Sequence, residues 1–157
     1  MPGILFRDIT TLLQNAEGFR YVIDQFVKRY KRIPIDIVTG IESRGFIIGG
    51  AIAHQLGKGF VPIRKPDKLP AEKLSVEYSL EYGTDRIEMH TDAISRGDHV
   101  LMIDDLLATG GTMKAACELV EKAGGEVVEC GFIIHLAELK GEELLKDYAV
   151  FSMVRYD

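Results

Sequence analysis

The sequence predicts an α/β protein with an open, mostly parallel twisted sheet and helices on both faces. Short apolar runs rich in β-branched residues alternate along the chain with amphipathic helical patterns, and this alternation is typical of a parallel sheet built from strand-helix-strand units. One unit is visible in full, because an apolar run at 100–103, a Thr/Gly-rich loop and a helical pattern precede a second apolar run at 126–136. Two strands joined in this way lie parallel in one sheet.

Size, charge and composition narrow the class of protein. A chain of 157 residues without repeats or linkers fits one domain spanning 1–157. The net charge of −5 argues against a nucleic-acid partner, because such proteins usually carry a basic face. No apolar run approaches the ~20 residues of a membrane helix, and the N-terminus has no signal-peptide pattern, so we expect a cytoplasmic protein without membrane contact.

The cysteines and histidines carry no metal or redox signature. Cys117 and Cys130 lack the Cys-x-x-Cys spacing, so reduced thiols in the core are expected. The four histidines share no metal-ligand spacing, and none is assigned to a metal.

The first long helix is predicted over 17–31, because its apolar residues recur at helical spacing and basic residues occupy its last turn. These apolar residues are Phe19, Val22, Ile23, Phe26, Val27 and Tyr30. Pro34 ends the helical pattern, and a short strand is predicted at 35–39. Residues 40–45 then form a tight connection to a second helix, rich in small residues, that continues through Leu56.

A strand is predicted at 59–63, followed by a lid over about 64–91. Prolines exclude a helix from 64–70, and three cations there form a basic cluster in an acidic protein. Residues 71–91 alternate weakly, with 82–85 as the turn region, which predicts a hairpin folded over the active site. The remaining elements are a short helix and a closing edge strand, at 142–146 and 150–154.

The stretch from 100 to 112 carries the strongest functional signal. The strand runs into Asp104 and Asp105, and the Thr/Gly-rich turn after them leads into a helix whose apolar face is formed by Met113, Ala116, Cys117 and Val120. The N–H groups and dipole at a helix N-terminus favour phosphate, whereas carboxylates suit hydroxyls or a metal. The pattern therefore predicts a phosphorylated ribose, with its diol at the acids and its phosphate at the turn.

Two other interpretations of this stretch remain open. A strand ending in two aspartates also occurs in nucleotide triphosphatases as a Mg²⁺ site, although this chain lacks the Gly-x-x-x-x-Gly-Lys-[Ser/Thr] motif before it. The Thr-Gly-Gly-Thr turn could also serve only to reverse the chain.

Ser43-Arg44-Gly45 occupies a second strand-to-helix loop. Because ligands bind at the carboxyl edge of parallel strands, both loops are expected to face one ligand with phosphates at both ends. Arg44 suits this task, since its planar guanidinium can make paired hydrogen bonds to phosphate oxygens. The alternative is a surface arginine without a ligand.

Five segments, in order along the chain, resemble the type I phosphoribosyltransferases. They are Pro2-Gly-Ile-Leu-Phe-Arg-Asp-Ile-Thr, Gly40-Ile-Glu-Ser-Arg-Gly-Phe, Arg64-Lys-Pro-Asp-Lys-Leu-Pro, Tyr78-Ser-Leu-Glu-Tyr-Gly-Thr-Asp and Val100-Leu-Met-Ile-Asp-Asp-Leu-Leu-Ala-Thr-Gly-Gly-Thr. The last segment is most similar to the form found in members that use adenine. The resemblance covers nearly the whole chain. The main difference from the family is the stretch before Pro2, which is shorter here than in most members.

The resemblance implies the type I phosphoribosyltransferase fold with a flexible lid, and a purine-salvage reaction. Adenine and 5-phosphoribosyl 1-pyrophosphate (PRPP) would give AMP and pyrophosphate, in a site that uses Mg²⁺ held mainly by the substrate and no protein metal ligand. The resemblance also implies a homodimer.

The resemblance also carries roles to individual residues. Glu81 is implied as the acid or base that serves the purine, with a solvated hairpin charge as the alternative. Ribose-phosphate binding is implied for Asp104, Asp105, Ala108, Thr109, Gly110, Gly111 and Thr112. Pyrophosphate binding is implied for Arg44, Lys65, Lys68 and Tyr82. Adenine binding is implied for Leu5, Phe6, Arg7 and Leu136; from the sequence alone, Leu5 and Phe6 fit core positions equally well.

Two rival functions remain at this point. A xanthine or hypoxanthine phosphoribosyltransferase would share the ribose-phosphate signature and differ at the base pocket. A non-catalytic regulator that senses PRPP is the second rival. Such a regulator should carry a DNA-binding module or a basic face, and the sequence indicates neither.

Overall fold

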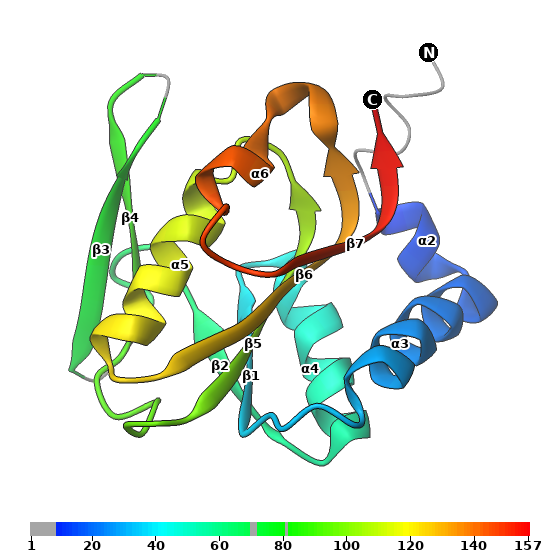
Figure 1. Cartoon of the computed structure of the whole chain (residues 1–157), viewed down its shortest axis with the longest axis horizontal. Coiled ribbons are helices and arrows are strands. Elements are labelled where there is room, and N and C mark those ends of the chain that lie inside the picture. The colour runs from blue at the N-terminus through cyan, green and yellow to red at the C-terminus, as the bar shows by residue number, and fades with distance from the viewer. Residues whose placement is uncertain (1–8, 70–71, 81) are drawn as a thin grey trace.

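The fold is built around a central parallel sheet (Figure 1). The computed structural model describes residues 9–69, 72–80 and 82–157. The sheet has five strands in the order β2-β1-β5-β6-β7, and each neighbouring pair is parallel. The strands are β1 (Ile37–Ile41), β2 (Gly59–Ile63), β5 (His99–Leu107), β6 (Glu126–Leu136) and β7 (Val150–Tyr156). The predicted parallel sheet is therefore confirmed, and β7 is the edge strand that the sequence predicted.

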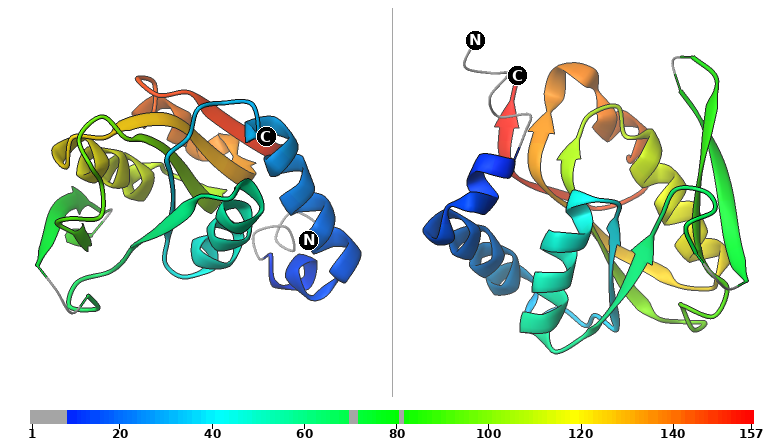
Figure 2. Two further views of the ribbon diagram at one scale, coloured as in Figure 1. Left: turned by 90° about the horizontal axis from the view of Figure 1, so that it is seen from below. Right: turned by 180° about the vertical axis from the view of Figure 1, so that it is seen from behind.

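Helices cover both faces of this sheet, as predicted (Figure 2). The first face carries α2 (Thr10–Gln14), α3 (Ala16–Tyr30) and α4 (Arg44–Leu56), and the second carries α5 (Gly111–Lys122). Two short elements, η1 (Ala137–Leu139) and α6 (Gly141–Leu144), follow β6.

The alternation of side chains along β5 divides the core into two layers. Leu101 and Ile103 face the layer formed with α3 and α4, whereas Val100 and Met102 face the layer formed with α5. All four are fully buried, since successive residues of a strand point to opposite faces and both faces are covered here. The central strand β5 is therefore packed against other elements on both of its faces.

The predicted hairpin is present as a separate two-stranded sheet. Its strands β3 (Lys73–Ser79) and β4 (Thr84–His90) are antiparallel and pack against α5. The turn is earlier than the predicted 82–85, because Thr84 already pairs with Ser79 and the Leu80 N–H donates to the Gly83 carbonyl. Figure 1 shows this hairpin beside α5, at the side of the molecule.

The boundaries of β1 differ from the predicted 35–39. Gly40 and Ile41 pair with Pro62 and Ile63 of β2, so the glycine predicted to begin the connection belongs to the strand. A Cβ on Gly40 would lie 2.4 Å from the Gly45 carbonyl oxygen. The glycine is therefore required by the close approach of α4, and not by a turn.

Three other boundaries differ from the prediction. β5 continues beyond 103 to Leu107, because its last residues pair with β6. β7 extends to Tyr156, which pairs with Leu136. The short helix after β6 spans Gly141–Leu144 in place of 142–146. Strand pairings set the first two of these ends, and a local sequence pattern does not contain such pairings.

The two cysteines are free and buried, as predicted. Their Sγ atoms are 3.5 Å apart, which is longer than a disulfide bond. The hydrogen bond between them and burial in the core raise the pKa of the Cys117 thiol. Within the described residues, no helix has the length and apolar character needed to span a membrane.

Candidate active site

A cavity of about 440 Å³ lies at the carboxyl ends of β1 and β5. From β1 the chain continues to β2 on one side, and from β5 it continues to β6 on the other. Such a point of divergence between neighbouring parallel strands is where open α/β sheets bind ligands. The described residues that line the cavity are Ile41, Glu42, Ser43, Arg44, Lys65, Asp104, Asp105, Leu106, Leu107, Ala108, Thr109, Gly110, Thr112, Met113 and Phe132.

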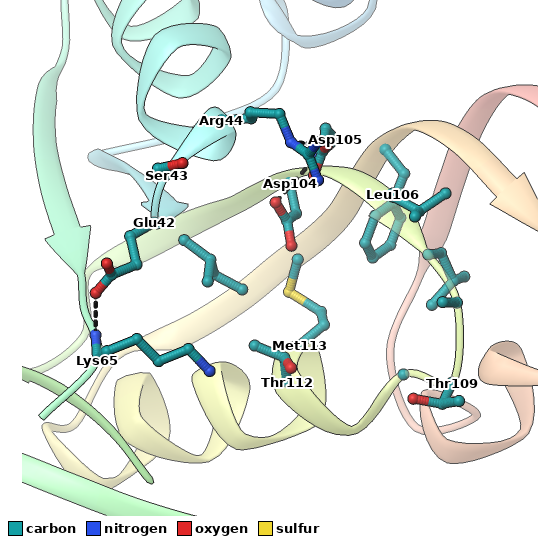
Figure 3. A pocket seen from close by; sticks show the side chains of 15 residues that line it. Glu42, Ser43, Arg44, Lys65, Asp104, Asp105, Leu106, Thr109, Thr112 and Met113 are labelled. Atoms are coloured by element: carbon teal, nitrogen blue, oxygen red, sulfur yellow. Dashed lines mark hydrogen bonds and ion pairs between the residues drawn. The ribbon is translucent and has the colours of Figure 1, made fainter. Parts of the chain in front are cut away.

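The turn at 108–112 forms one side of the cavity, at the start of α5 (Figure 3). Gly110 precedes the helix with φ +87°, a conformation that glycine adopts without strain. The turn also rests against the start of α6, because a Cβ on Gly110 would lie 2.5 Å from the Gly141 carbonyl oxygen. The backbone thus presents a helix N-terminus to the cavity, in the arrangement that favours a phosphate.

The two acids at the end of β5 differ in their surroundings. The Asp105 carboxylate is buried and forms an ion pair with Arg44, at 2.8 Å between Oδ2 and Nε. Figure 3 shows the Arg44 side chain directed toward Asp105. Asp104 accepts the Asp105 N–H, and burial together with the neighbouring Asp105 charge raises the pKa of the Asp104 carboxyl well above its usual value. Carboxyl groups beside a cavity can bind hydroxyl groups in either protonation state.

The loop after β1 is tied to the chain after β2. The Glu42 carboxylate accepts a hydrogen bond from the backbone N–H of Lys65, and Ser43 and Arg44 follow it at the start of α4. The two segments therefore meet at one wall of the cavity, and Lys65 extends from this contact toward Thr112 in the view of Figure 3.

The Lys65 ammonium group reaches between the cavity and the hairpin. Its Nζ donates to Asp85 Oδ2 at 2.5 Å and to the Tyr78 hydroxyl at 2.8 Å. Burial opposes the charge on Lys65, but these hydrogen bonds outweigh it and raise the pKa of the Lys65 ammonium. The same contact with Lys65 lowers the pKa of the Asp85 carboxyl. A fully charged lysine therefore stands at the rim of the cavity.

The structure brings together most of the site residues that the sequence predicted. Those that line the cavity are Arg44, Lys65, Asp104, Asp105, Ala108, Thr109, Gly110 and Thr112. Gly111 is the first residue of α5, in the same turn. Lys68 and Tyr82 are exposed and do not line the cavity.

None of the predicted adenine-binding residues, nor the predicted base, is found among the described residues that line the cavity. Leu136 does not line the cavity; it is buried in the core layer formed with α3 and α4. The other predicted residues, Leu5, Phe6, Arg7 and Glu81, lie outside the described residues.

Sequence reasoning missed several residues of the cavity wall. Glu42 had a signal, since it is a carboxylate directly before the Ser43-Arg44 pair at the end of a strand. Met113 and Phe132 were predicted only as apolar residues of a helix and a strand, and their position at the cavity follows from the tertiary packing.

The chain is similar to known proteins over almost its full length. Residues 8–156 match the family model described as phosphoribosyl transferase domain. An adenine phosphoribosyltransferase of Methylobacillus flagellatus is 57% identical over 158 residues, which cover 99% of this chain and 90% of that protein.

Solved structures agree with this match. The adenine phosphoribosyltransferase of Thermoanaerobacter pseudethanolicus has a TM-score of 0.92 at 46% identity, covering 95% of this chain and 87% of that one. The enzyme from Trypanosoma brucei, solved with AMP, pyrophosphate and ribose-5-phosphate, has a TM-score of 0.88 at 33% identity, covering 94% and 68%. The resemblance predicted from the five sequence segments is confirmed. The chain belongs to the phosphoribosyl transferase family, among the adenine phosphoribosyltransferases.

Proposed function

We propose that the protein transfers the phosphoribosyl group of PRPP to adenine, forming AMP and pyrophosphate in purine salvage. The observation that carries this proposal is one cavity bounded by two strand-to-helix loops with an acidic pair between them. This arrangement suits a sugar that carries phosphate groups at both ends. The relatives named above have this activity in their names.

Each part of the cavity is assigned to one part of PRPP. The turn at 108–112 binds the 5-phosphate through backbone N–H groups, and Asp104 and Asp105 bind the ribose hydroxyls. Arg44 and Lys65 bind the pyrophosphate, for which Arg44 exchanges its contact with Asp105.

The hairpin completes the site by closing over it. Lys68 and Tyr82 are assigned to the pyrophosphate, and both are exposed outside the cavity, so their role requires the chain around Lys68 and the tip of the hairpin to move toward the bound substrate. Closure of such a lid excludes water from a reactive sugar cation.

The adenine end and the proton chemistry are assigned from the family. Leu5, Phe6, Arg7 and Leu136 are assigned to adenine by the family resemblance, although Leu136 is buried outside the cavity, and Glu81 is assigned to the proton at the ring. The reaction needs no protein nucleophile, because the purine nitrogen itself attacks the anomeric carbon as pyrophosphate leaves. Catalysis then depends on placement and electrostatic stabilisation.

Mg²⁺ is proposed as the cofactor. Asp104 and Asp105 fit its chemistry, because Mg²⁺ is commonly bound by one or two carboxylates together with substrate phosphates. Among the described residues there is no cluster of three or more His, Cys, Asp or Glu side chains that could hold a metal, and the proposal therefore assigns most of its ligands to PRPP. When bound, the ion neutralises charge on the pyrophosphate.

An assay of nucleotide formation with each purine tests the proposed function. With PRPP and Mg²⁺ present, we expect AMP from adenine and negligible product from hypoxanthine or xanthine. Faster turnover of hypoxanthine or xanthine would establish the sister specificity. Binding of PRPP without any product would indicate a sensor.

Asp105→Ala is expected to weaken PRPP binding roughly ten- to a hundredfold, since a charge-assisted hydrogen bond contributes about 1.5 to 3 kcal/mol. Isothermal titration calorimetry measures this affinity. Asp36→Ala is the matched control, because Asp36 accepts the His99 N–H at the opposite, amino end of the strands. Equal PRPP affinities for the two variants would defeat the assignment of Asp105.

We further propose a homodimer in the cytoplasm. The family resemblance supports it, and two-fold dimers are the commonest protein oligomers. Sedimentation at assay concentration is expected to show a dimer, and a fully active monomer would contradict this proposal.

A further inference from the structure

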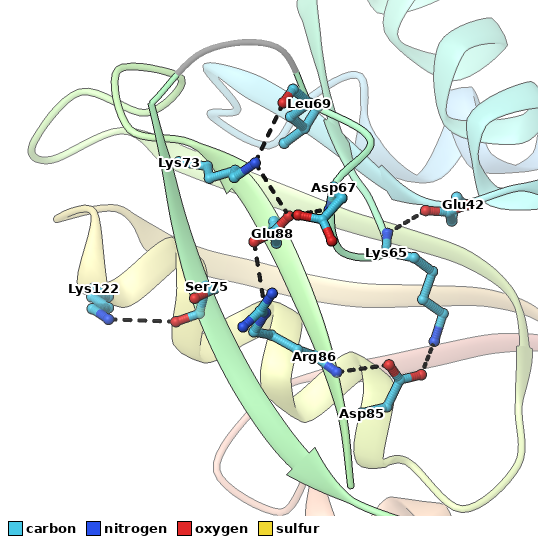
Figure 4. Close-up of polar contacts among 10 residues, drawn as sticks. All are labelled: Glu42, Lys65, Asp67, Leu69, Lys73, Ser75, Asp85, Arg86, Glu88 and Lys122. Atoms are coloured by element: carbon cyan, nitrogen blue, oxygen red, sulfur yellow. Dashed lines mark hydrogen bonds and ion pairs between the residues drawn. The ribbon is translucent and has the colours of Figure 1, made fainter.

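Glu88 is a buried carboxylate that lies outside the cavity and has no part in the proposed chemistry. Only 3% of it is exposed. Its Oε1 accepts the backbone N–H of Asp67 at 2.8 Å, and the cations of Lys73 and Arg86 lie 3.9 and 3.7 Å from its oxygens. Figure 4 shows it at the centre of these contacts. A buried charge is costly unless it is paired and hydrogen-bonded, so this network calls for an explanation.

The network holds the backbone that follows β2. Arg64 and Glu88 exchange both backbone hydrogen bonds, at 2.9 and 2.7 Å. Asp67 has φ +63°, a left-handed conformation that costs a residue other than glycine roughly 1 to 2 kcal/mol. The hydrogen bond from the Asp67 N–H to the Glu88 carboxylate stabilises that conformation. Glu88 therefore fixes both ends of the short segment 64–67.

Lys65 lies inside this segment. Its backbone N–H is held by Glu42 from the cavity side, and its side chain lines the cavity. Residues on both sides of Lys65 are held by Glu88. Figure 4 shows the two carboxylates on opposite sides of the segment. The direction in which Lys65 leaves the backbone is thus set by Glu42 and Glu88 together.

We propose that Glu88 is a positioning residue for PRPP, which acts through Lys65 by fixing the backbone of segment 64–67. The inference rests on the proposed function, in which Lys65 binds the pyrophosphate. A lysine side chain has many rotamers. Its ammonium group therefore binds one phosphate group well only when the backbone that carries the side chain is held in place. Loss of the Glu88 carboxylate releases the Asp67 end of the segment and moves the ammonium group away from the pyrophosphate.

Glu129 offers a matched control for the purely structural role of a buried glutamate. It is 6% exposed and accepts hydrogen bonds from Arg29, at 2.6 Å to Oε1. It joins β6 to α3 and does not line the cavity. Substitutions at Glu88 and Glu129 therefore both remove a buried acid, but only Glu88 contacts the segment that carries Lys65.

The test compares Glu88→Met, Glu88→Gln and Glu129→Met by steady-state kinetics and thermal melting. Methionine keeps the buried volume and removes the acceptor for the Asp67 N–H. Glu88→Met is expected to raise the KM for PRPP roughly ten- to a hundredfold, as a displaced binding group does, with little change in the KM for adenine. Glu88→Gln keeps one oxygen acceptor, so a smaller rise is expected. Glu129→Met should lower the melting temperature without changing the KM for PRPP.

A double-mutant cycle with Lys65→Ala decides whether Glu88 acts through Lys65. In the Lys65→Ala background, the Glu88 substitutions should add nothing further to the KM for PRPP. A rise that persists in that background, or no rise at all, overturns the proposal. If Glu88→Met fails to fold, the same cycle with Glu88→Gln gives the same decision.

The proposed function and this inference can fail independently. If the proposed function is correct, the protein without substitutions forms AMP. If it does not, the PRPP dissociation constants of the same variants, measured by calorimetry, still show whether Glu88 and Lys65 are coupled.

Discussion

Replacing Glu81 by glutamine is expected to lower turnover with adenine by about 10² to 10⁴, the usual contribution of a positioned acid or base. Attack by the purine nitrogen on the sugar requires a ring proton to leave, and a carboxylate can accept that proton whereas an amide of the same shape cannot. The affinity for PRPP should stay nearly constant, because the substitution keeps the size and hydrogen-bonding reach of the side chain. Single-turnover kinetics separate these two effects.

A second hairpin glutamate provides the control for this prediction. Glu77 is exposed on β3, and Glu77→Gln removes the same charge from the same hairpin without a role at the purine. We expect it to leave the single-turnover rate unchanged. An unchanged rate for Glu81→Gln as well would show that Glu81 is not the base, and Tyr82 or water would then be the better candidate.

The elements could be predicted where the sequence pattern is local. The apolar spacing of Met113, Ala116, Cys117 and Val120 identified the buried face of α5, and all four are at most 2% exposed. The strand-turn-helix order around 100–112 predicted the turn before α5 for the same reason. A residue's own neighbours in the chain decide these features, so a single sequence contains them.

The parts of the site that join distant segments could not be predicted. The ion pair between Arg44 and Asp105 joins the loop after β1 to β5. The contact between Glu42 and the Lys65 N–H joins that loop to the chain after β2. Each depends on the order of strands in the sheet, which places β1 between β2 and β5. The residue types of this site can therefore be predicted from the sequence, but the strand order decides which of these residues contact one another.

Glycines show the same division between local and long-range causes. Gly40 and Gly110 both precede a helix and both were predicted to lie in connections. Gly110 does so with a positive φ, whereas Gly40 is a strand residue that is small because Gly45 approaches it. A glycine that allows backbone contact and a glycine that allows a turn are identical in a sequence.

Gly110→Ala is expected to destabilise the protein and to weaken PRPP binding at least tenfold. Alanine at φ +87° costs roughly 1 to 2 kcal/mol in backbone strain. Its Cβ would also meet the Gly141 carbonyl oxygen at 2.5 Å, so the turn and α6 must separate. The backbone N–H groups that are proposed to bind the phosphate then lose their arrangement, and a loss of about 1.4 kcal/mol in binding is already tenfold in affinity. Thermal melting and calorimetry with PRPP measure the two effects.

Gly57→Ala separates the contact with α6 from the backbone strain. Gly57 ends α4 with φ +70°, and a Cβ built on it meets nothing within 4 Å. The alanine there suffers strain of the same kind in open space, away from the cavity. We therefore expect Gly57→Ala to lower the melting temperature and leave PRPP affinity unchanged, so that only Gly110→Ala changes both. If the two variants bind PRPP equally well, contact between the turn at 108–112 and α6 does not shape the phosphate site.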